Sequence, residues 1–204
     1  MDTGIREPKQ RRAINKKDRI IEAGFELICE NGYYNTNTAE IAKKADVSTG
    51  IVYQYFKDKH DILMEAIEKY GEDIFFPMLK LSYKEINITN FNETIRNMIE
   101  NYVTNHKVSK IAHEEIMAMV HSDKDIADYY YKRELEMTDT LKTILIKNNF
   151  SEQNLYEKVH VMIGLIDNLC HEKIYHKHSS MNYDIMTDIV IENIEQLFKE
   201  DLKQ

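Results

Sequence analysis

Apolar residues recur at intervals of three and four along most of this 204-residue chain, and only six glycines and two prolines interrupt the pattern. That spacing lines apolar side chains along one stripe of an α-helix, whereas a half-buried strand would alternate with a period of two. No hairpin dipeptide stands between alternating segments. The sequence therefore predicts an all-α fold of about nine helices.

Capping residues and polar loop residues set the bounds of the predicted helices. Thr36 or Asn37 is expected to cap the second helix, Ser48 the third and Asp58 the fourth. A loop rich in Ser, Asn and Thr is predicted over 82–92. The predicted helices span 16–31, 38–45, a third ending near 56, a fourth broken near Pro77, and then 91–106, 109–120, 124–147, 152–176 and 184–202.

Charge is distributed unevenly along a chain whose formal net charge is -8. Residues 1–60 carry 11 basic and 9 acidic side chains, whereas residues 61–204 carry 16 and 26. Within residues 1–20, seven basic side chains face only three acids. This asymmetry is typical of a basic arm that meets phosphate, or of a solvated and disordered tail.

Several classes of protein are excluded by what the sequence lacks. No run approaches the roughly 18 apolar residues that a membrane span needs, and the first 15 residues have no apolar signal core. Cys29 and Cys170 have neither CxxC spacing nor a secretory context. No Walker loop, GxGxxG or GxSxG motif is present. We expect a soluble cytoplasmic protein that is not an enzyme and has no membrane partner.

The two short helices that end near residues 45 and 56 are too small to hold a core without the first helix beneath them. Two such helices joined by a tight turn form a helix-turn-helix. The second must keep a small, polar face outside if it is to enter a major groove about 12 Å wide. The residues available for that face are Ser48, Thr49, Gly50, Tyr53 and Gln54, with Ile51, Val52 and Phe56 left to anchor the helix.

Residues 30–63 resemble the DNA-binding domain of the TetR family of transcriptional regulators, and the similarity extends over roughly 14–64. Asp46 stands where the family more often has Gly, and Asp tolerates the left-handed backbone that such a turn needs. The resemblance rests on several spaced elements: a Gly-Tyr that ends the first helix, a Thr-rich entry, Ile41-Ala42, Val47-Ser48, Gly50, Tyr53-x-Tyr55-Phe56 and Lys59.

The resemblance implies a role for each matched position. Phosphate contacts are implied for Thr38, Tyr53, Tyr55 and Lys59, although the two tyrosines are also suited to packing. Thr49, Gly50 and Gln54 become the candidates for base contacts, and Gln54 can pair bidentately with adenine. The basic arm, with Arg11, Arg12, Lys16 and Lys17, would add phosphate or minor-groove contacts.

The resemblance further implies that the rest of the chain is a helical domain that binds a small molecule and dimerises through its last two helices. The expected organisation is an arm over 1–15, a helix-turn-helix domain over 16–60 and a ligand-binding and dimerisation domain over 61–204. Both terminal helices also suit completion of the monomer's own core. The predicted dimer-interface residues are Met162, Gly164, Ile166, Val190, Ile194 and Leu197.

Soft and aromatic residues on the later helices are candidates for an effector site, because methionine adapts to irregular apolar ligands. The same spacing also suits ordinary core packing. Asp167 offers charge to a cationic ligand, although acids on helices are mostly solvated. The predicted ligand-binding residues are Phe75, Met98, Tyr102, Met117, Tyr130, Met137 and Asp167.

Together these observations predict a homodimeric repressor that a small apolar or amphipathic effector releases from a palindromic operator in double-stranded DNA, with no cofactor and no bound metal. Two alternatives from other classes remain. One is a helical small-molecule binding module. The other is a metal-responsive sensor that uses His160, Asp167 and His171 on one helical face.

Overall fold

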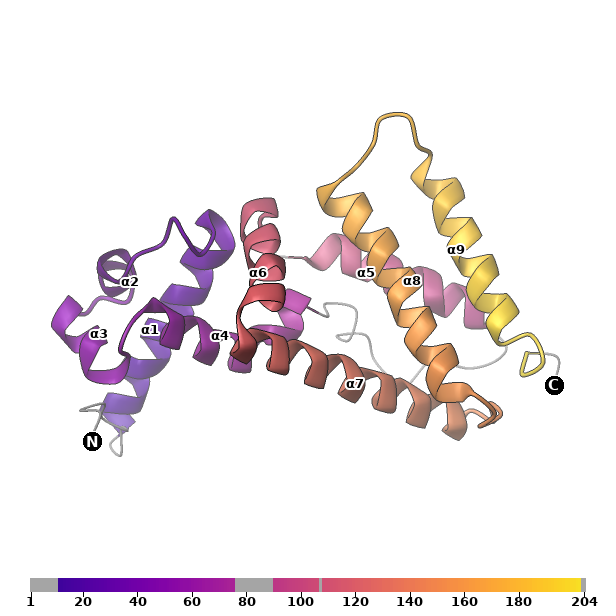
Figure 1. Cartoon of the computed structure of the whole chain (residues 1–204), viewed down its shortest axis with the longest axis horizontal. Coiled ribbons are helices and arrows are strands. Elements are labelled where there is room, and N and C mark those ends of the chain that lie inside the picture. Colours follow the sequence, from indigo (N-terminus) through magenta and orange to yellow (C-terminus); the bar gives the residue numbers. More distant parts are fainter. Residues whose placement is uncertain (1–10, 76–89, 107, 203–204) are drawn as a thin grey trace. The chain divides into compact units, whose positions relative to one another are not determined.

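The computed structural model describes residues 11–75, 90–106 and 108–202. Within these residues the chain forms nine α-helices and no strand, which confirms the all-α prediction (Figure 1). The predicted break near Pro77 and most of the predicted loop lie outside the described residues. The helices are α1 (Arg11–Asn31), α2 (Thr38–Lys44), α3 (Thr49–Tyr55), α4 (Lys59–Phe75), α5 (Phe91–Asn105), α6 (Lys110–Ser122), α7 (Lys124–Lys147), α8 (Leu155–Tyr175) and α9 (Tyr183–Leu197).

Three helix ends differ from the predicted bounds by several residues. Helix α1 begins at Arg11, five residues before the predicted start, so residues 11–15 are helical and do not belong to a flexible arm. Arg, Ala, Lys and Ile favour or tolerate helix, and Asn15, although it is a common capping residue, lies inside α1. Helix α8 begins only after Asn154, whose φ of 53° is left-handed, and α9 ends at Leu197, before a run of turns.

Side-chain caps fix the start of several helices. The Asn37 side chain accepts hydrogen bonds from the amides of Ala39 and Glu40, so of the two predicted caps of α2 it is Asn37 that acts. At the start of α4, Asp58 accepts from the amides of His60 and Asp61, as predicted. Each bond satisfies an amide that has no partner within its helix.

The chain divides into two compact units. The first unit contains residues 1–76 and 107–130, and the second contains 77–106 and 131–204. Helix α7 crosses the division between Tyr130 and Tyr131. The predicted boundary at residue 60 concerns function and stays a prediction.

The first unit is built on α1. Helices α2, α4 and α6 pack against it, and α3 packs on α2. Its centre is filled by branched and aromatic side chains that are almost fully buried, so the two short helices have a foundation that they could not provide themselves. These residues include Ile20, Ile41, Val52, Phe56 and Ile62.

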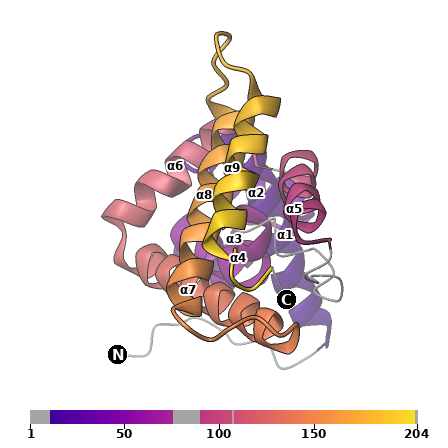
Figure 2. The ribbon, with the colours of Figure 1, turned by 90° about the vertical axis from the view of Figure 1, so that its right-hand side faces the viewer.

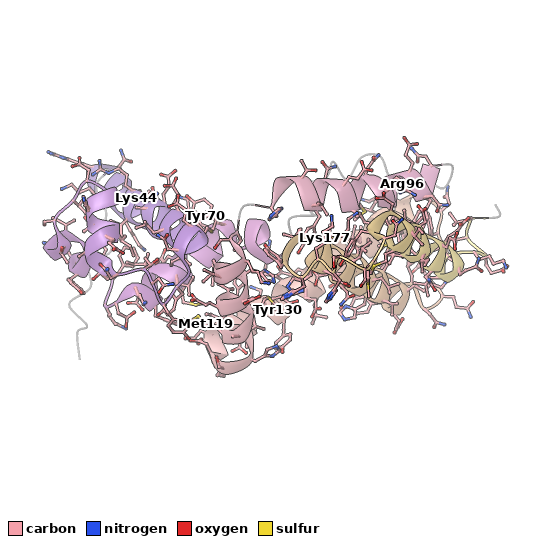
Figure 3. The ribbon with its side chains drawn as sticks, turned by 90° about the horizontal axis from the view of Figure 1, so that it is seen from above. Lys44, Tyr70, Arg96, Met119, Tyr130 and Lys177 are labelled. Carbon is pink, nitrogen blue, oxygen red and sulfur yellow. The ribbon has the colours of Figure 1, made fainter. Side chains whose placement is uncertain are left out.

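The second unit packs α5, α8 and α9 against one another. Figure 2 shows α8 and α9 side by side along their length. Phe91, Phe150 and Phe198 form an aromatic cluster with ring centroids 5.4–5.7 Å apart. An ion pair of 2.7 Å joins Arg96 of α5 to Asp188 of α9, and Figure 3 labels Arg96 on its helix.

No helix in the described part of the chain is long and apolar enough to cross a membrane.

Both cysteines are buried thiols, one in each unit. The thiol of Cys170 has its pKa raised to about 12 by burial and by the nearby charge of Asp167. It therefore stays protonated and behaves as a small apolar core residue.

Candidate nucleic-acid interface

Helix α3 separates its polar side chains from its apolar ones. Val52 and Phe56 have at most 1% of their surface exposed, and they fix the helix to the core of the first unit. On the other side Tyr53 is 52% exposed, and Gln54 is also exposed. All five residues of the predicted DNA-facing set are exposed or partly exposed: Ser48, Thr49, Gly50, Tyr53 and Gln54.

The turn between α2 and α3 adopts the expected left-handed backbone. Asp46 has a φ of 53°, a conformation in which a short polar side chain substitutes for glycine. The Val47 amide donates to the carbonyl of Ala42 at 3.0 Å, and Arg19 of α1 donates to the carbonyl of Asp46 at 3.2 Å. These bonds fix the direction in which α3 leaves the turn.

Ser48 precedes α3 at the N-cap position, but its side chain does not cap the helix as predicted. The Ser48 carbonyl accepts from the amides of Ile51 and Val52, whereas its hydroxyl makes no capping hydrogen bond. The prediction of a side-chain cap was therefore wrong, because the backbone alone closes this turn. An exposed hydroxyl remains on the DNA-facing side of α3.

The hydroxyls of Thr38 and Tyr53 lie 2.9 Å apart, so they share a hydrogen bond that joins the start of α2 to α3. Both residues were predicted to contact phosphate. The structure brings them together at the rim of the helix-turn-helix, where each hydroxyl has a free lone pair or proton for a further partner. Their contact with phosphate stays a prediction.

Tyr55 faces the other way. It is 9% exposed and packs in the core of the first unit, with Ala42 and Ala66 among the core residues. A side chain buried to this degree contributes packing, so the packing interpretation of Tyr55 is favoured over the phosphate contact that the resemblance implied.

Lys59 is held by carbonyl groups of the loop between α1 and α2. Its ammonium donates to the carbonyl of Tyr33 at 2.7 Å and to that of Thr36 at 3.0 Å, and it lies 4.2 Å from the Tyr33 ring centroid. Burial lowers the pKa of Lys59, while the charge of Glu115 acts in the opposite direction. The structure thus gives Lys59 a structural role in closing this loop, and its predicted phosphate contact competes with that role.

The loop that Lys59 closes is also bound by α6. The Glu115 carboxylate accepts from the amide of Tyr34 at 3.1 Å, and the Ser109 amide donates to the carbonyl of Cys29 at 2.9 Å. Gly32 has a φ of 87° and lies so close to Glu115 that a side chain would overlap it. The backbone of this loop is therefore fixed from two sides.

Most cations of the first unit already have acidic partners. Lys17 pairs with Glu65 at 2.5 Å, and Lys44, labelled in Figure 3, pairs with Glu26 at 3.0 Å. Arg12 is exposed and Lys16 partly exposed, and neither makes an ion pair in the described part of the chain. The side chain of Arg11 lies outside the described residues.

Lys57 is a candidate that sequence reasoning did not select. It lies two residues after the end of α3, is exposed and makes no ion pair with a described residue, while its amide donates to Asp61 at 2.8 Å. The sequence signal that could have identified Lys57 is its position next to Phe56, at the end of the predicted third helix. Together with Arg12 and Lys16 it supplies the positive charge that phosphate contacts need.

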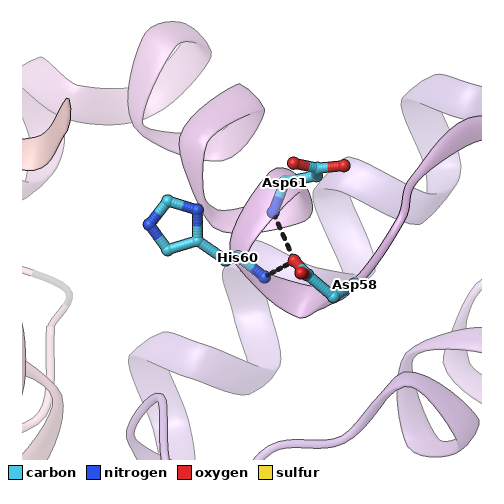
Figure 4. Close-up of side chains that lie close together, drawn as sticks. All are labelled: Asp58, His60 and Asp61. Atoms are coloured by element: carbon cyan, nitrogen blue, oxygen red, sulfur yellow. Dashed lines mark hydrogen bonds between the residues drawn. The ribbon is translucent and has the colours of Figure 1, made fainter. Parts of the chain in front are cut away.

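Asp58, His60 and Asp61 place possible metal-ligand atoms within 4.8 Å of one another, and no other set of three does so among the described residues. Figure 4 shows the carboxylate of Asp58 directed at the amides of the following turn. The His60 ring instead pairs with Asp123 at 2.7 Å. These contacts explain the cluster as a helix cap and a link to α7. The predicted metal set of His160, Asp167 and His171 is not brought together.

The predicted effector residues are divided between the two units. Met117 and Tyr130 lie in the first, and Figure 3 labels Tyr130. Phe75 also belongs to the first unit, but its side chain is outside the described residues. The remaining four lie in the second unit. Within the second unit Tyr102 donates to Asp167 at 3.2 Å, and Met98 and Met137 are buried.

Half of the predicted dimer-interface residues are buried inside the single chain. Met162, Ile166 and Ile194 are at most 1% exposed in a single chain, so they cannot bury further surface against a second copy. This stripe of α8 completes the core of the second unit, which was the alternative interpretation. Gly164 is exposed, and Val190 and Leu197 are partly exposed. The large apolar side chains left outside on these helices are Val161, Ile185 and Ile189, and Met181 is exposed between the two helices.

Comparison with known proteins supports the helix-turn-helix assignment. Residues 20–66 match the family model described as bacterial regulatory proteins of the TetR family. The chain is 43% identical over 63 residues to the HTH-type transcriptional regulator HbdR of Aromatoleum sp., which is 29% of this chain and 28% of that protein. It is 46% identical over 67 residues to the fatty acid metabolism regulator protein of Bacillus subtilis. That match covers 32% of this chain and 34% of the relative. The matches thus span about a third of these relatives or less.

A solved structure extends the comparison to nearly the whole chain. A regulator from Saccharomonospora viridis, crystallised with choline, superposes with a TM-score of 0.62 and covers 88% of this chain and 95% of its own. The two sequences are 22% identical, so this likeness concerns the fold alone. The second unit therefore shares its architecture with solved proteins, while the sequence similarity is concentrated in the helix-turn-helix.

Proposed function

We propose that the protein regulates transcription by inserting α3 into the major groove of duplex DNA. The proposal starts from the match of residues 20–66 to the family model of bacterial TetR regulatory proteins. One observation supports this most strongly. The outward face of α3 carries a hydroxyl, a glycine and an amide at neighbouring positions, whereas its inward face is almost fully buried. A helix with this division can approach base edges without losing its anchor.

The exposed residues suit two kinds of contact. Two hydroxyls and three cations are suited to phosphate oxygens, which position a protein without reading sequence. They belong to Thr38 and Tyr53 and to Arg12, Lys16 and Lys57, which make no ion pair with a described residue. Thr49, Gly50 and Gln54 are suited to the groove floor. Gln54 supplies the paired donor and acceptor that adenine requires, and Gly50 allows close approach.

The proposal includes a homodimer formed through the exposed apolar residues of α8 and α9. Val161 and Gly164 are three residues apart on α8, and Ile185 and Ile189 are four apart on α9, which is the spacing of one helical face. Exposed apolar residues at such spacing favour a contact that a second copy can match by twofold symmetry. Two α3 helices would then meet half-sites about one turn of DNA apart, roughly 34–36 Å.

The final element is control by a small molecule in the cytoplasm, with the regulator acting as a repressor. The choline complex of the structural relative supports the idea that this fold accommodates a small organic ligand. A ligand that prefers a conformer with a different spacing of the α3 helices lowers operator affinity by its differential affinity for the two states, typically 1–3 kcal/mol. A helical binding module without DNA affinity is the competing function.

The test is selection of bound duplexes from a random library with the full-length chain, followed by footprinting. We expect a palindrome with two half-sites separated by one helical turn. A library that stays random through repeated rounds at low ionic strength would favour the binding module and contradict the proposal.

The dimer has its own test. Sedimentation equilibrium of Ile189→Glu should show monomers at concentrations where the wild type is dimeric, because a charge would be buried in the apolar contact. Ile14→Glu changes an apolar residue of similar exposure on α1 and should leave the dimer intact. Dissociation by both changes, or by neither, would argue against this interface.

A further inference from the structure

Asp167 of α8 is a carboxylate in a largely buried place. Its only hydrogen bond within the described residues comes from the hydroxyl of Tyr102, at 3.2 Å, and it makes no ion pair there. Tyr102 belongs to α5 and is 3% exposed. Charges removed from water are normally paired, because an isolated one is strongly disfavoured.

A second acid makes the position of Asp167 less favourable. Burial and, to a smaller degree, the negative charge of Glu134 on α7 raise the pKa of Asp167 to about 6, although the hydrogen bond from Tyr102 lowers it. Above that pH the site holds a carboxylate beside a second acid. Three helices thus converge on negative charge that no described residue neutralises.

Aromatic rings adjoin this charge. Tyr102 lies within electrostatic reach of Tyr175, which is 8% exposed. The His171 ring centroid lies 5.4 Å from that of Tyr175, and His171 follows Asp167 by four residues, on the same side of α8. A carboxylate with aromatic rings nearby suits organic ammonium groups, which are attracted by the charge and by the negative face of a ring.

A bare metal ion fits this place less well. Among the described residues no three ligand atoms from the second unit lie within 4.8 Å of one another, so Asp167, Glu134 and His171 do not form a coordination set. An organic cation is larger and needs no such geometry. Buried Met98 and Met137 in the same unit suit the apolar part of such a ligand.

We propose that the second unit binds an organic ammonium ion with an apolar substituent, with Asp167 as its counter-ion and Glu134 as a second negative group. Tyr102 orients the Asp167 carboxylate and presents a ring to the cation. That this cation is the effector that releases DNA rests on the proposed function, whereas the binding site itself does not.

The experiment measures the thermal shift and calorimetric titration of the full chain with tetramethylammonium, benzyltrimethylammonium and decyltrimethylammonium. Benzyl alcohol serves as a neutral aromatic probe. We expect at least one ammonium probe to bind with one site per chain, and Asp167→Asn to weaken its binding at least tenfold. Glu157→Gln, which removes an exposed charge on the same helix, should change affinity less than twofold.

A second variant separates charge from structure. Tyr102→Phe keeps the ring and the carboxylate but removes the hydrogen bond that orients the carboxylate, so it should weaken cation binding by about three- to tenfold, less than Asp167→Asn does. If none of the three ammonium probes binds the folded wild type, or if Asp167→Asn binds them as tightly, the proposed site is wrong. The Tyr102–Asp167 hydrogen bond would then serve only to join α5 to α8.

The readouts also separate this proposal from the proposed function. DNA binding without cation binding contradicts the cation site alone. Cation binding by a chain that selects no duplex contradicts the regulatory function and leaves the site in place. Binding of both, with no effect of the cation on the DNA complex, rejects its role as the effector.

Discussion

The two units of this protein differ in how they hold one partly buried charge each, Lys59 in the first and Asp167 in the second. In the first, cations such as Lys17, Lys44 and Lys59 are held by acids or carbonyls. In the second, the largely buried carboxylate of Asp167 has no cationic partner among the described residues. The cations of the first unit therefore join the elements on which α3 rests, whereas the second unit retains a charge that is costly for folding and, under our proposal, useful for a ligand.

This difference matches where sequence similarity is found. The relatives share 43–46% identity over 63–67 residues around the helix-turn-helix, and the second unit is related to the solved structure by fold alone. A rigid surface for one kind of partner, duplex DNA, restricts many residues at once. A site for a particular small molecule depends on a few side chains placed on a tolerant helical scaffold.

The largest effect that would test the rigidity of the first unit is expected for Gly32→Ala. The φ of 87° disfavours any side chain, and the new Cβ would lie 2.6 Å from Glu115 and 2.9 Å from Ile111. We expect the free energy of unfolding to fall by about 2–3 kcal/mol in urea denaturation. Gly50→Ala, where the Cβ meets only Ser48 at 3.9 Å, should not destabilise the chain. Equal losses from both would contradict the rigid loop.

The next effect concerns Lys59, whose ammonium holds two carbonyls of the same loop. Lys59→Met keeps the alkyl stem and removes the charge, and we expect a loss of about 2 kcal/mol of stability, because hydrogen bonds from charged groups contribute roughly 1.5–3 kcal/mol. Lys57→Met removes an exposed charge nearby and should change stability by less than about 0.5 kcal/mol. A Lys59→Met protein with wild-type stability and weaker DNA binding would instead support the phosphate role.

For the second unit, Asp167→Asn should stabilise the chain. A carboxyl with a higher pKa in the folded state, about 6 against 3.8, binds its proton more tightly when folded. Stability therefore falls as pH rises from about 4 to 6 and stays lower above that range. We expect the variant to exceed the wild type by about 1–2 kcal/mol at pH 7.5, after allowance for partial exposure, and to match it near pH 4. A destabilised variant at pH 7.5 would mean that Asp167 is satisfied in the fold.

The smallest effect is that of a single phosphate contact. Lys57→Met should weaken binding to every duplex by a similar factor and reduce the slope of log affinity against log salt by about one. Glu40→Gln changes an exposed charge on α2 and provides the matched control. We expect its slope of log affinity against log salt to stay within about 0.3 of the wild-type slope. An unchanged slope in Lys57→Met would remove that lysine from the interface.

The local features of the helix-turn-helix were predictable because short-range chemistry determines them. Asn37 caps α2 and Asp46 takes the left-handed turn, and both follow from residue type and position. The roles of Ser48, Tyr55 and Lys59 were not predictable in the same way. Each depends on which neighbouring element reaches the side chain, and no single helix of the sequence contains that information.

The dimer face illustrates the same limit. Spacing identified an apolar stripe on α8 that includes Met162 and Ile166, but a helix with apolar residues on two sides has to bury one of them within the chain. The structure assigns that stripe to the core and leaves Val161 outside. Asp167 was selected as a candidate because it is charged. That it lies beside Tyr102 and Glu134, without an ion pair to a described residue, depends on how α5 and α7 are placed around it.

The central claim is that the outward face of α3 reads DNA sequence, and Gln54→Ala tests it most directly. The measurement compares the affinities of wild type and variant for the selected operator and for a scrambled duplex at one salt concentration. We predict that the variant binds the operator about 10- to 100-fold more weakly, equivalent to the 1–3 kcal/mol of one bidentate base contact, and binds the scrambled duplex as the wild type does. An equal loss on both duplexes, or no loss on either, would contradict the claim.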